Sequence, residues 1–324
     1  MKLHEDKKLF REAVEFTAQQ MDILDIYVEK DYWVTYALHT IFHNPIGEEA
    51  IFKGGTALSK CHGLIDRFSE DIDLVVRRKE GETNNQLKTK IKQITKVVSD
   101  VLPEVHIEEV TQKMGMIRKT AHTYEKEFKG KYGQVRDVII VEATWLGNYE
   151  PYTTEKVSCY LADMMRENGQ TEYIEKYNLQ SFDMKVLGKD RTLCEKIMSL
   201  VRFSRQEKDP YPDLANKVRH IYDIHLMLKD TEIKNFFDSS DFDEMLVVVG
   251  RDDLISFKNN NEWLSEHPVK AIIFDKPEET WGNIKSAYNT TFKELVFGDL
   301  PKEEKLVATL KNVSKRLSSV KWGL

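Results

Sequence analysis

The chain reads Phe52-Lys53-Gly54-Gly55-Thr56-Ala57-Leu58 and, a short distance later, Arg67-Phe68-Ser69-Glu70-Asp71-Ile72-Asp73-Leu74. Acidic and apolar residues alternate in the second stretch, which predicts a strand with Asp71 and Asp73 on the same face. Two carboxylates held this close repel each other unless a cation lies between them. Mg²⁺ takes hard oxygen ligands of this kind together with substrate phosphates, so the pair indicates a metal site.

The first stretch supplies groups that can contact a phosphate. Gly54 and Gly55 let the backbone approach without a Cβ in the way, and Thr56 adds a hydroxyl donor. Either motif alone is weak evidence, because exposed strands often carry two acids. Together, with fourteen residues between Thr56 and Asp71, they resemble the nucleotidyltransferase superfamily, in which a glycine-containing turn precedes a metal-binding D-x-D strand.

The wording of further motifs narrows the resemblance to the AbiEii/AbiGii toxin family of nucleotidyltransferases. Three more runs match that family: Glu29-Lys30-Asp31-Tyr32-Trp33, Thr192-Leu193-Cys194-Glu195-Lys196 and Arg219-His220-Ile221-Tyr222-Asp223-Ile224. The matches extend from about residue 29 to residue 228. One position departs from the pattern, since the family usually has Arg-Asp where this chain has Arg219-His220.

The resemblance implies roles for residues outside the first two stretches. Lys196 would stabilise the negative charge of a triphosphate, and Asp223 would position Lys196 or a nucleotide hydroxyl. Asp223 also lies four residues after Arg219 on one helix face, so a structural salt bridge is the alternative for this acid and for Lys196. The superfamily also implies a third metal-binding acid on a neighbouring strand. Glu142 is the candidate, and the alternative is an ordinary acid at a strand end.

The resemblance implies an enzyme that moves a nucleoside monophosphate from an NTP to an acceptor hydroxyl and releases pyrophosphate. Asp71, Asp73 and Glu142 would hold two Mg²⁺ ions, while residues 54–56 and Lys196 would bind the nucleotide. A toxin of a toxin–antitoxin or phage-defence system is implied, with a tRNA 3′ end as acceptor and a separate antitoxin protein. Two other classes stay open: a non-catalytic nucleotide-binding or interaction module, and a kinase-like phosphotransferase, since a lysine and two acids also serve γ-phosphoryl transfer.

The hydrophobic pattern predicts an α+β fold, a nucleotidyltransferase-like mixed β-sheet with flanking helices followed by a mostly helical C-terminal domain. The first fifty residues have helical periodicity. Strands are predicted at residues 71–76, 105–110, 113–123 and 134–145, and helices at residues 84–101, 192–203, 214–228, 233–237, 281–295 and 303–317. The predicted domains are residues 1–170 and 171–324, the second contributing Lys196 and Asp223.

Composition excludes several classes of protein. The 324 residues carry 48 Lys and Arg against 54 Asp and Glu, a net charge of −6 that argues against an architectural nucleic-acid binder. No apolar run approaches the ~20 residues that span a bilayer, and the N-terminus lacks the apolar segment of a signal peptide. We therefore expect a cytoplasmic protein with no membrane partner. Cys61, Cys159 and Cys194 form no C-x-x-C pair, which disfavours a disulfide framework and a zinc site.

Other site motifs are missing or ambiguous. The sequence contains no P-loop, no G-x-G-x-x-G and no G-x-S-x-G. His39 and His43 have H-x-x-x-H spacing, but Thr40 stands where a zinc hydrolase needs a glutamate base. The basic run from Arg118 to Lys131, which contains aromatic residues, has the composition of an RNA-contacting segment and equally that of a solvated hairpin.

Overall fold

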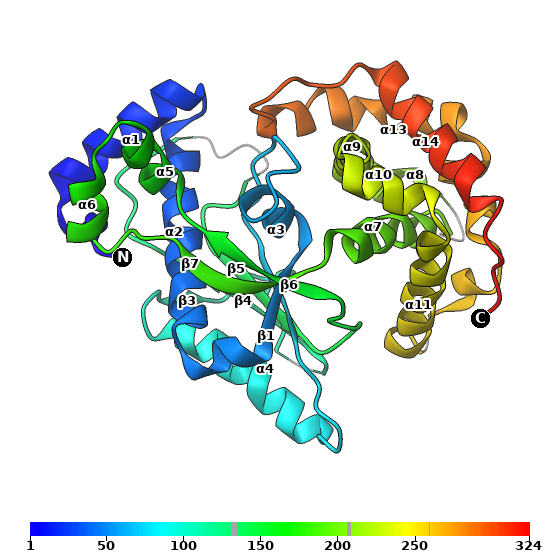
Figure 1. The fold of residues 1–324 in the computed structure, drawn as a ribbon, viewed down its shortest axis with the longest axis horizontal. Coiled ribbons are helices and arrows are strands. Elements are labelled where there is room, and N and C mark those ends of the chain that lie inside the picture. The colour runs from blue at the N-terminus through cyan, green and yellow to red at the C-terminus, as the bar shows by residue number, and fades with distance from the viewer. Residues whose placement is uncertain (114, 131–134, 206–208, 259) are drawn as a thin grey trace. The chain divides into compact units, whose positions relative to one another are not determined.

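A mixed β-sheet is the centre of the N-terminal part of the computed structural model, which describes all residues except 114, 131–134, 206–208 and 259 (Figure 1). In the described part of the chain seven strands pair in the order β3-β4-β5-β2-β1-β7-β6. Their bounds are β1 Ala50–Lys53, β2 Ile72–Val76, β3 Glu104–Val105, β4 Ile117–His122, β5 Ile139–Thr144, β6 Tyr152–Val157 and β7 Phe182–Leu187. β2 runs parallel to β5 and antiparallel to β1, and β1 runs parallel to β7.

Helices of the same part pack against this sheet and against one another. They are η1 Leu3–Glu5, α1 Lys7–Met21, α2 Asp25–Phe42, η2 Pro45–Glu49, α3 Gly54–Lys60, α4 Asn84–Ser99, α5 Tyr160–Glu167 and α6 Thr171–Lys176. α4 lies on β2, β4 and β5, and α2 lies on β5 and β7. A capping box between Thr83 and Gln86 begins α4, and its residues at helical spacing, Leu87, Ile91, Ile94 and Val98, are buried. No residue of α2 is exposed.

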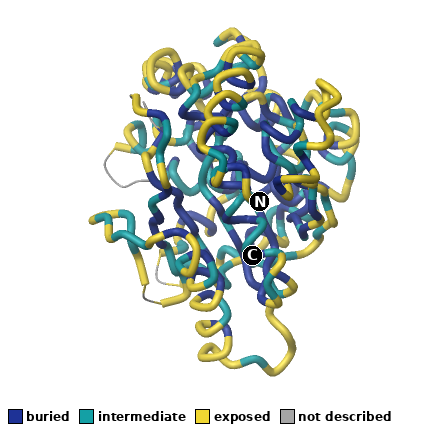
Figure 2. The backbone as a smooth tube through the Cα atoms, turned by 90° about the vertical axis from the view of Figure 1, so that its left-hand side faces the viewer, coloured by how far each residue is buried: buried dark blue, intermediate teal, exposed yellow. Residues whose placement is uncertain are grey.

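The regular elements among the described residues of the C-terminal part, from Lys189 onward, are all helices joined by turns and loops. Its elements are α7 Lys189–Phe203, α8 Tyr211–Ala215, α9 Val218–Met227, α10 Thr231–Asp238, α11 Ser240–Ser256, η3 Glu262–Leu264, η4 Pro268–Lys270, α12 Ile272–Asp275, α13 Pro277–Asn289, η5 Phe292–Leu295 and α14 Glu303–Leu317. α7 packs against α9, α10 and α11, and α9 also contacts α13 and α14. Figure 2 shows buried residues inside and exposed ones on outer turns and loops.

The chain divides into two compact units that are not simple halves. The first unit comprises Met1–Gly63 and Phe68–Leu187, and the second comprises Leu64–Arg67 and Gly188–Leu324. Residues 64–67 belong to the second unit because Arg67 bridges to Val296 and the Phe297 N–H donates to the Asp66 carbonyl at 3.1 Å. One of the points at which the chain passes between the two units therefore lies between Arg67 and Phe68, inside the run Arg67–Leu74.

The predicted fold class is confirmed, while several element boundaries are wrong. Only Glu104–Val105 of the predicted strand at 105–110 pairs with a neighbour, because the N–H groups of Val110 and Thr111 turn back to the Ile107 carbonyl. The helix predicted at 214–228 is two helices, α8 and α9. Strands β6 and β7 were not predicted. Because β7 pairs with β1 and β6, the first unit continues past residue 170 to Leu187.

Two predictions about the chain as a whole can be compared with the structure. None of the helices among the described residues has the length and apolar character needed to cross a bilayer. Cys61, Cys159 and Cys194 are free thiols, as the absence of paired cysteine motifs predicts.

Candidate active site

Asp71, Asp73 and Glu142 lie on or beside two adjacent strands of the first unit. Asp73 is on β2, opposite Glu142 on the parallel strand β5, and Asp71 immediately precedes β2. Ile72 and Leu74 are fully buried, whereas Asp71 and Asp73 are half-buried. The alternation predicted from the sequence therefore turns both carboxylates away from the core, and the neighbouring strand brings a third acid beside them.

The electrostatics of this acid cluster are unfavourable without a cation. Burial and the charges of Asp71 and Glu142 raise the pKa of Asp73 to about 7, although Lys53 and Lys119 act in the opposite direction. One carboxylate oxygen of Asp71, Oδ1, is buried and has no hydrogen-bond partner among the described residues. Buried carboxylate oxygens without donors are the groups that a divalent cation satisfies. The carboxylate oxygens of Asp71 and Asp73 are therefore suitable ligands for a Mg²⁺ ion.

Glu142 has a protein partner of its own. Its carboxylate accepts a hydrogen bond from the Lys119 ammonium on β4 at 3.0 Å. Among the residues that the structure describes, no group of three or more His, Cys, Asp or Glu side chains is arranged to hold a metal ion. Glu142 would have to leave Lys119 in order to join Asp71 and Asp73 at a metal.

Gly54 lies so close to Asp73 that no other residue fits there. Its φ of +85° is in the left-handed region, and a Cβ built on it would lie 2.5 Å from Asp73 Oδ2. Both observations require glycine, because a side chain would strain the backbone and collide with the carboxylate. The glycine turn that begins α3 is thus in direct contact with the acid cluster.

Thr56 is buried, and its hydroxyl bonds within the protein. Thr56 Oγ1 donates to the Asp71 carbonyl oxygen at 2.7 Å and lies 2.9 Å from the Ser69 hydroxyl. These bonds tie the glycine turn to the backbone that leads into β2. The side chain therefore holds the two motifs together, a contact that the motif spacing alone did not indicate.

Lys196 and Asp223 meet inside the second unit. Lys196 Nζ on α7 donates to Asp223 Oδ2 on α9 at 2.7 Å, and both side chains are buried. Arg67 donates to the same carboxylate from Nε and Nη2, at 2.7 and 2.8 Å. Burial acts to raise the pKa of Asp223, but the Arg67 and Lys196 charges outweigh it and hold that pKa well below its usual range. One ionised acid thus holds two buried cations.

The surroundings of Lys196 carry an excess of positive charge. Burial lowers the pKa of Lys196, Asp223 opposes this, and the cations Arg67 and Arg219 add to it. Arg219 is exposed. Asp223, four residues later on α9, is buried and is paired with Arg67 and Lys196. At the position where the sequence departs from the family, His220 has a buried Nδ1 without a hydrogen-bond partner among the described residues.

The run Glu29-Lys30-Asp31 matched the family without suggesting a role, and the structure shows three buried charges. Glu29 accepts from the N–H groups of Glu127 and Phe128, at 2.7 and 3.3 Å. Lys30 pairs with Glu70, and Asp31 pairs with Lys60. The sequence could have indicated a buried charge here. Three successive positions cover most of the circumference of a helix, so at least one of three successive charged residues faces the core when the helix is otherwise apolar.

The basic segment that has the composition of an RNA contact is largely engaged within the first unit. Arg118 Nε donates to Thr95 Oγ1 at 2.6 Å, and Lys119 pairs with Glu142. Lys126 donates to Asp137 at 2.8 Å. Residues 131 and 132 lie outside the described part of the chain. These pairings favour the structural interpretation of the segment.

The chain is similar to known nucleotidyltransferase toxins. A family model described as "Nucleotidyl transferase AbiEii toxin, Type IV TA system" matches residues 36–309. Among solved structures, the chain is similar to MenT4, a nucleotidyltransferase toxin from Mycobacterium tuberculosis H37Rv. That likeness has 14% sequence identity and a TM-score of 0.49, and covers 95% of this chain and 99% of MenT4. No curated protein sequence matches the chain.

Proposed function

Because this chain belongs to the AbiEii family of nucleotidyltransferase toxins and is a nucleotidyltransferase, we propose that it transfers a nucleoside monophosphate from an NTP to an acceptor hydroxyl in a Mg²⁺-dependent reaction. The acceptor oxygen forms a bond to the α-phosphorus, and the bond from that phosphorus to the bridging oxygen breaks. Pyrophosphate leaves, and the hydroxyl proton passes to a carboxylate or to water. The family match supports the reaction class, and the acid cluster supports the metal dependence.

The observation that carries the proposal is the position of Asp73 between other acids. It lies two residues after Asp71, which immediately precedes β2, and opposite Glu142 on β5, and its pKa is raised to about 7. Oδ1 of Asp71 is buried without a hydrogen-bond partner in the described part of the chain, which supports the same proposal. Mg²⁺ bound to such acids neutralises phosphate charge and favours ionisation of the acceptor hydroxyl. Asp71 and Asp73 would hold the first ion, and Glu142 would contribute to a second.

Further residues would bind and orient the nucleotide. The backbone of Gly54 and Gly55 would lie against the triphosphate, supported by the contact of Gly54 with Asp73. The Thr56 hydroxyl would keep that turn attached to Asp71 through its carbonyl. Lys196 would stabilise the negative charge of the triphosphate, and Asp223 would hold its ammonium in place.

The proposed partners rest on the family. A type IV toxin–antitoxin system pairs a toxin with an antitoxin, so we propose a cognate antitoxin protein, a cytoplasmic location and a role in phage defence. An RNA with a free 3′ hydroxyl, such as tRNA, supplies the acceptor that nucleotidyl transfer needs.

The experiment that tests this proposal follows the phosphorus atoms. The protein is incubated with Mg²⁺, total tRNA and each NTP in turn, labelled once at the α-phosphorus and once at the γ-phosphorus. Nucleotidyl transfer places the α-label on RNA and leaves the γ-label in pyrophosphate. Transfer of the γ-label to RNA or protein would identify a kinase-like phosphotransferase. Mg²⁺-dependent NTP binding without turnover would identify a non-catalytic nucleotide-binding module.

A further inference from the structure

Lys30 is a fully buried lysine in the middle of α2, and the proposed reaction does not use it directly. A charge in this position is costly, because an ammonium loses its hydration when it is buried. Hydrophobic residues of similar volume often replace a buried ion pair without loss of stability. A gain in folding stability therefore does not account for the burial of Lys30 at this position.

Lys30 takes part in a closed set of bonds with two other segments. Its ammonium pairs with the Glu70 carboxylate and donates to the Arg136 carbonyl oxygen. The Arg136 N–H in turn donates to the other carboxylate oxygen of Glu70, at 3.0 Å. Three segments far apart in the sequence are thereby fixed at one point.

Two of these segments lead into the strands that carry the acids. Glu70 immediately precedes Asp71, and Arg136 lies on the segment that enters β5, the strand of Glu142. β2 and β5 are parallel, so their entries lie at the same edge of the sheet. We propose that Lys30 is a positioning residue, which fixes the entries of β2 and β5 and thereby the separation of Asp71 and Asp73 from Glu142. This inference rests on the proposed role of those acids as metal ligands.

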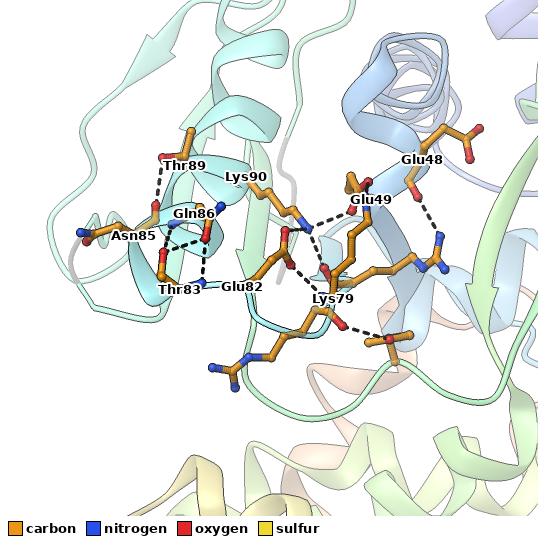
Figure 3. Close-up of polar contacts among 12 residues, drawn as sticks. Glu48, Glu49, Lys79, Glu82, Thr83, Asn85, Gln86, Thr89 and Lys90 are labelled. Carbon is orange, nitrogen blue, oxygen red and sulfur yellow. Dashed lines mark hydrogen bonds and ion pairs between the residues drawn. The ribbon is translucent and has the colours of Figure 1, made fainter.

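The opposite end of the β1–β2 pair offers a matched comparison. Lys90 on α4 pairs with Glu49 and Glu82 at 2.9 and 2.6 Å, and it donates to the Arg77 carbonyl at 2.9 Å (Figure 3). Glu49 immediately precedes β1 and Arg77 immediately follows β2. Ala50 pairs with Val76 at this end, whereas Lys53 pairs with Asp73 at the other. Lys90 thus makes the same kinds of bond as Lys30, away from the acids.

The experiment compares two charge-balanced double variants of the full chain, Lys30→Met with Glu70→Gln and Lys90→Met with Glu49→Gln. Each double variant loses one positive and one negative charge, so the electrostatic potential at Asp71, Asp73 and Glu142 stays nearly constant. Mn²⁺ affinity is measured by electron paramagnetic resonance, beside kcat, KM for NTP and melting temperature. We expect about 10-fold weaker Mn²⁺ binding and about 10-fold lower kcat in the Lys30 pair, because disturbed supporting residues typically cost that much. The Lys90 pair should stay within about 2-fold of the parent in both quantities.

Lys30→Gln alone provides a second test. It makes the site more negative, which by itself strengthens cation binding, so weaker Mn²⁺ binding in this variant reports a change of geometry. Mn²⁺ affinity equal to or above that of the parent in both Lys30 variants would overturn the proposal, as would equal losses in the Lys30 and Lys90 pairs. A parent that binds Mn²⁺ but transfers no nucleotide would contradict the proposed function instead, and the affinities would still decide the role of Lys30.

Discussion

Asp223 accepts two hydrogen bonds from the Arg67 guanidinium, at 2.7 and 2.8 Å, with both side chains buried. Arg67 stands four residues before Asp71 and groups with the second unit, while Asp71 belongs to the first. The run Arg67–Leu74, which contains the proposed metal ligands Asp71 and Asp73, is therefore held at its first residue by the Asp223 carboxylate. Asp223 has a structural task in addition to the proposed one of holding Lys196.

Asp223→Asn should destabilise the protein by about 3–5 kcal/mol, because it leaves Arg67 and Lys196 buried without a counter-charge. The lowered pKa of Asp223 fixes the pH dependence. Its stabilisation is complete above the unfolded-state pKa of about 3.9 and is lost as the pH falls through the lower folded pKa. Urea denaturation should show the full difference at about pH 7 and a shrinking one towards about pH 2.

Arg219→Gln is the matched control for that prediction, since Arg219 is an exposed cation on the same helix. Its free energy of unfolding should stay within about 0.5 kcal/mol of the parent. A large loss for Arg219→Gln together with a silent Asp223→Asn would mean that the pairing with Arg67 does not stabilise the fold.

Gly54→Ala should abolish most of the activity, whereas Gly81→Ala should not. Both glycines have left-handed backbones, with φ of +85° and +79°, so both substitutions strain the chain to a similar degree. At Gly54 the new Cβ meets the Asp73 carboxylate, while at Gly81 it has no neighbour within 4 Å among the residues that the structure describes. We expect a lower melting temperature in both variants, with the larger loss in Gly54→Ala because of the added collision, and a fall in kcat confined to Gly54→Ala. Equal kcat in the two variants would show that the contact with Asp73 is unimportant.

Asp73→Asn should change how the stability of the metal-free protein depends on pH. The pKa of Asp73 is raised to about 7 in the folded protein, whereas the same side chain ionises at about pH 4 in the unfolded chain. The parent should therefore lose stability as the pH rises from about 4 to about 7. The variant lacks this loss and should be the more stable of the two at about pH 8 in a chelator. Added Mg²⁺ should then stabilise the parent more than the variant. Parallel pH profiles would argue against strain among the acids.

Lys196→Met should lower kcat by at least ~10²-fold, the scale expected when a group aimed at developing charge is lost. Asp223 keeps its two bonds to Arg67 in this variant. The stability loss should therefore be smaller than that of Asp223→Asn, as thermal melting can show. Turnover close to that of the parent would leave Lys196 with a structural role only.

The sequence was most informative where the physical signal is local. Alternation of acidic and apolar residues predicted the strand that Asp71 precedes and that contains Asp73. Glu142 was a candidate because the family resemblance implies an acid on a neighbouring strand, and the structure pairs its strand, β5, with β2. The pairing of Arg67 with Asp223 spans 156 positions, and no periodicity can reveal it. In β7, Phe182, Met184 and Val186 do alternate with polar residues, but the segment is short and lies between helical ones. The contacts of Lys30 with Glu70 and Arg136 also join segments far apart in the sequence, so the sequence pattern could not predict them.

The most direct test of the central claim is the rate at which the α-label of an NTP enters RNA in the parent and in Asp71→Asn. Asp71 contributes a carboxylate oxygen that has no hydrogen-bond partner among the described residues, so the substitution breaks no hydrogen bond of that oxygen. We expect Mg²⁺-dependent labelling by the parent and at least ~10²-fold slower labelling by the variant, at an unchanged or slightly higher melting temperature. Labelling at the parental rate by Asp71→Asn, or its loss together with a large fall in melting temperature, would contradict a catalytic metal site at these acids.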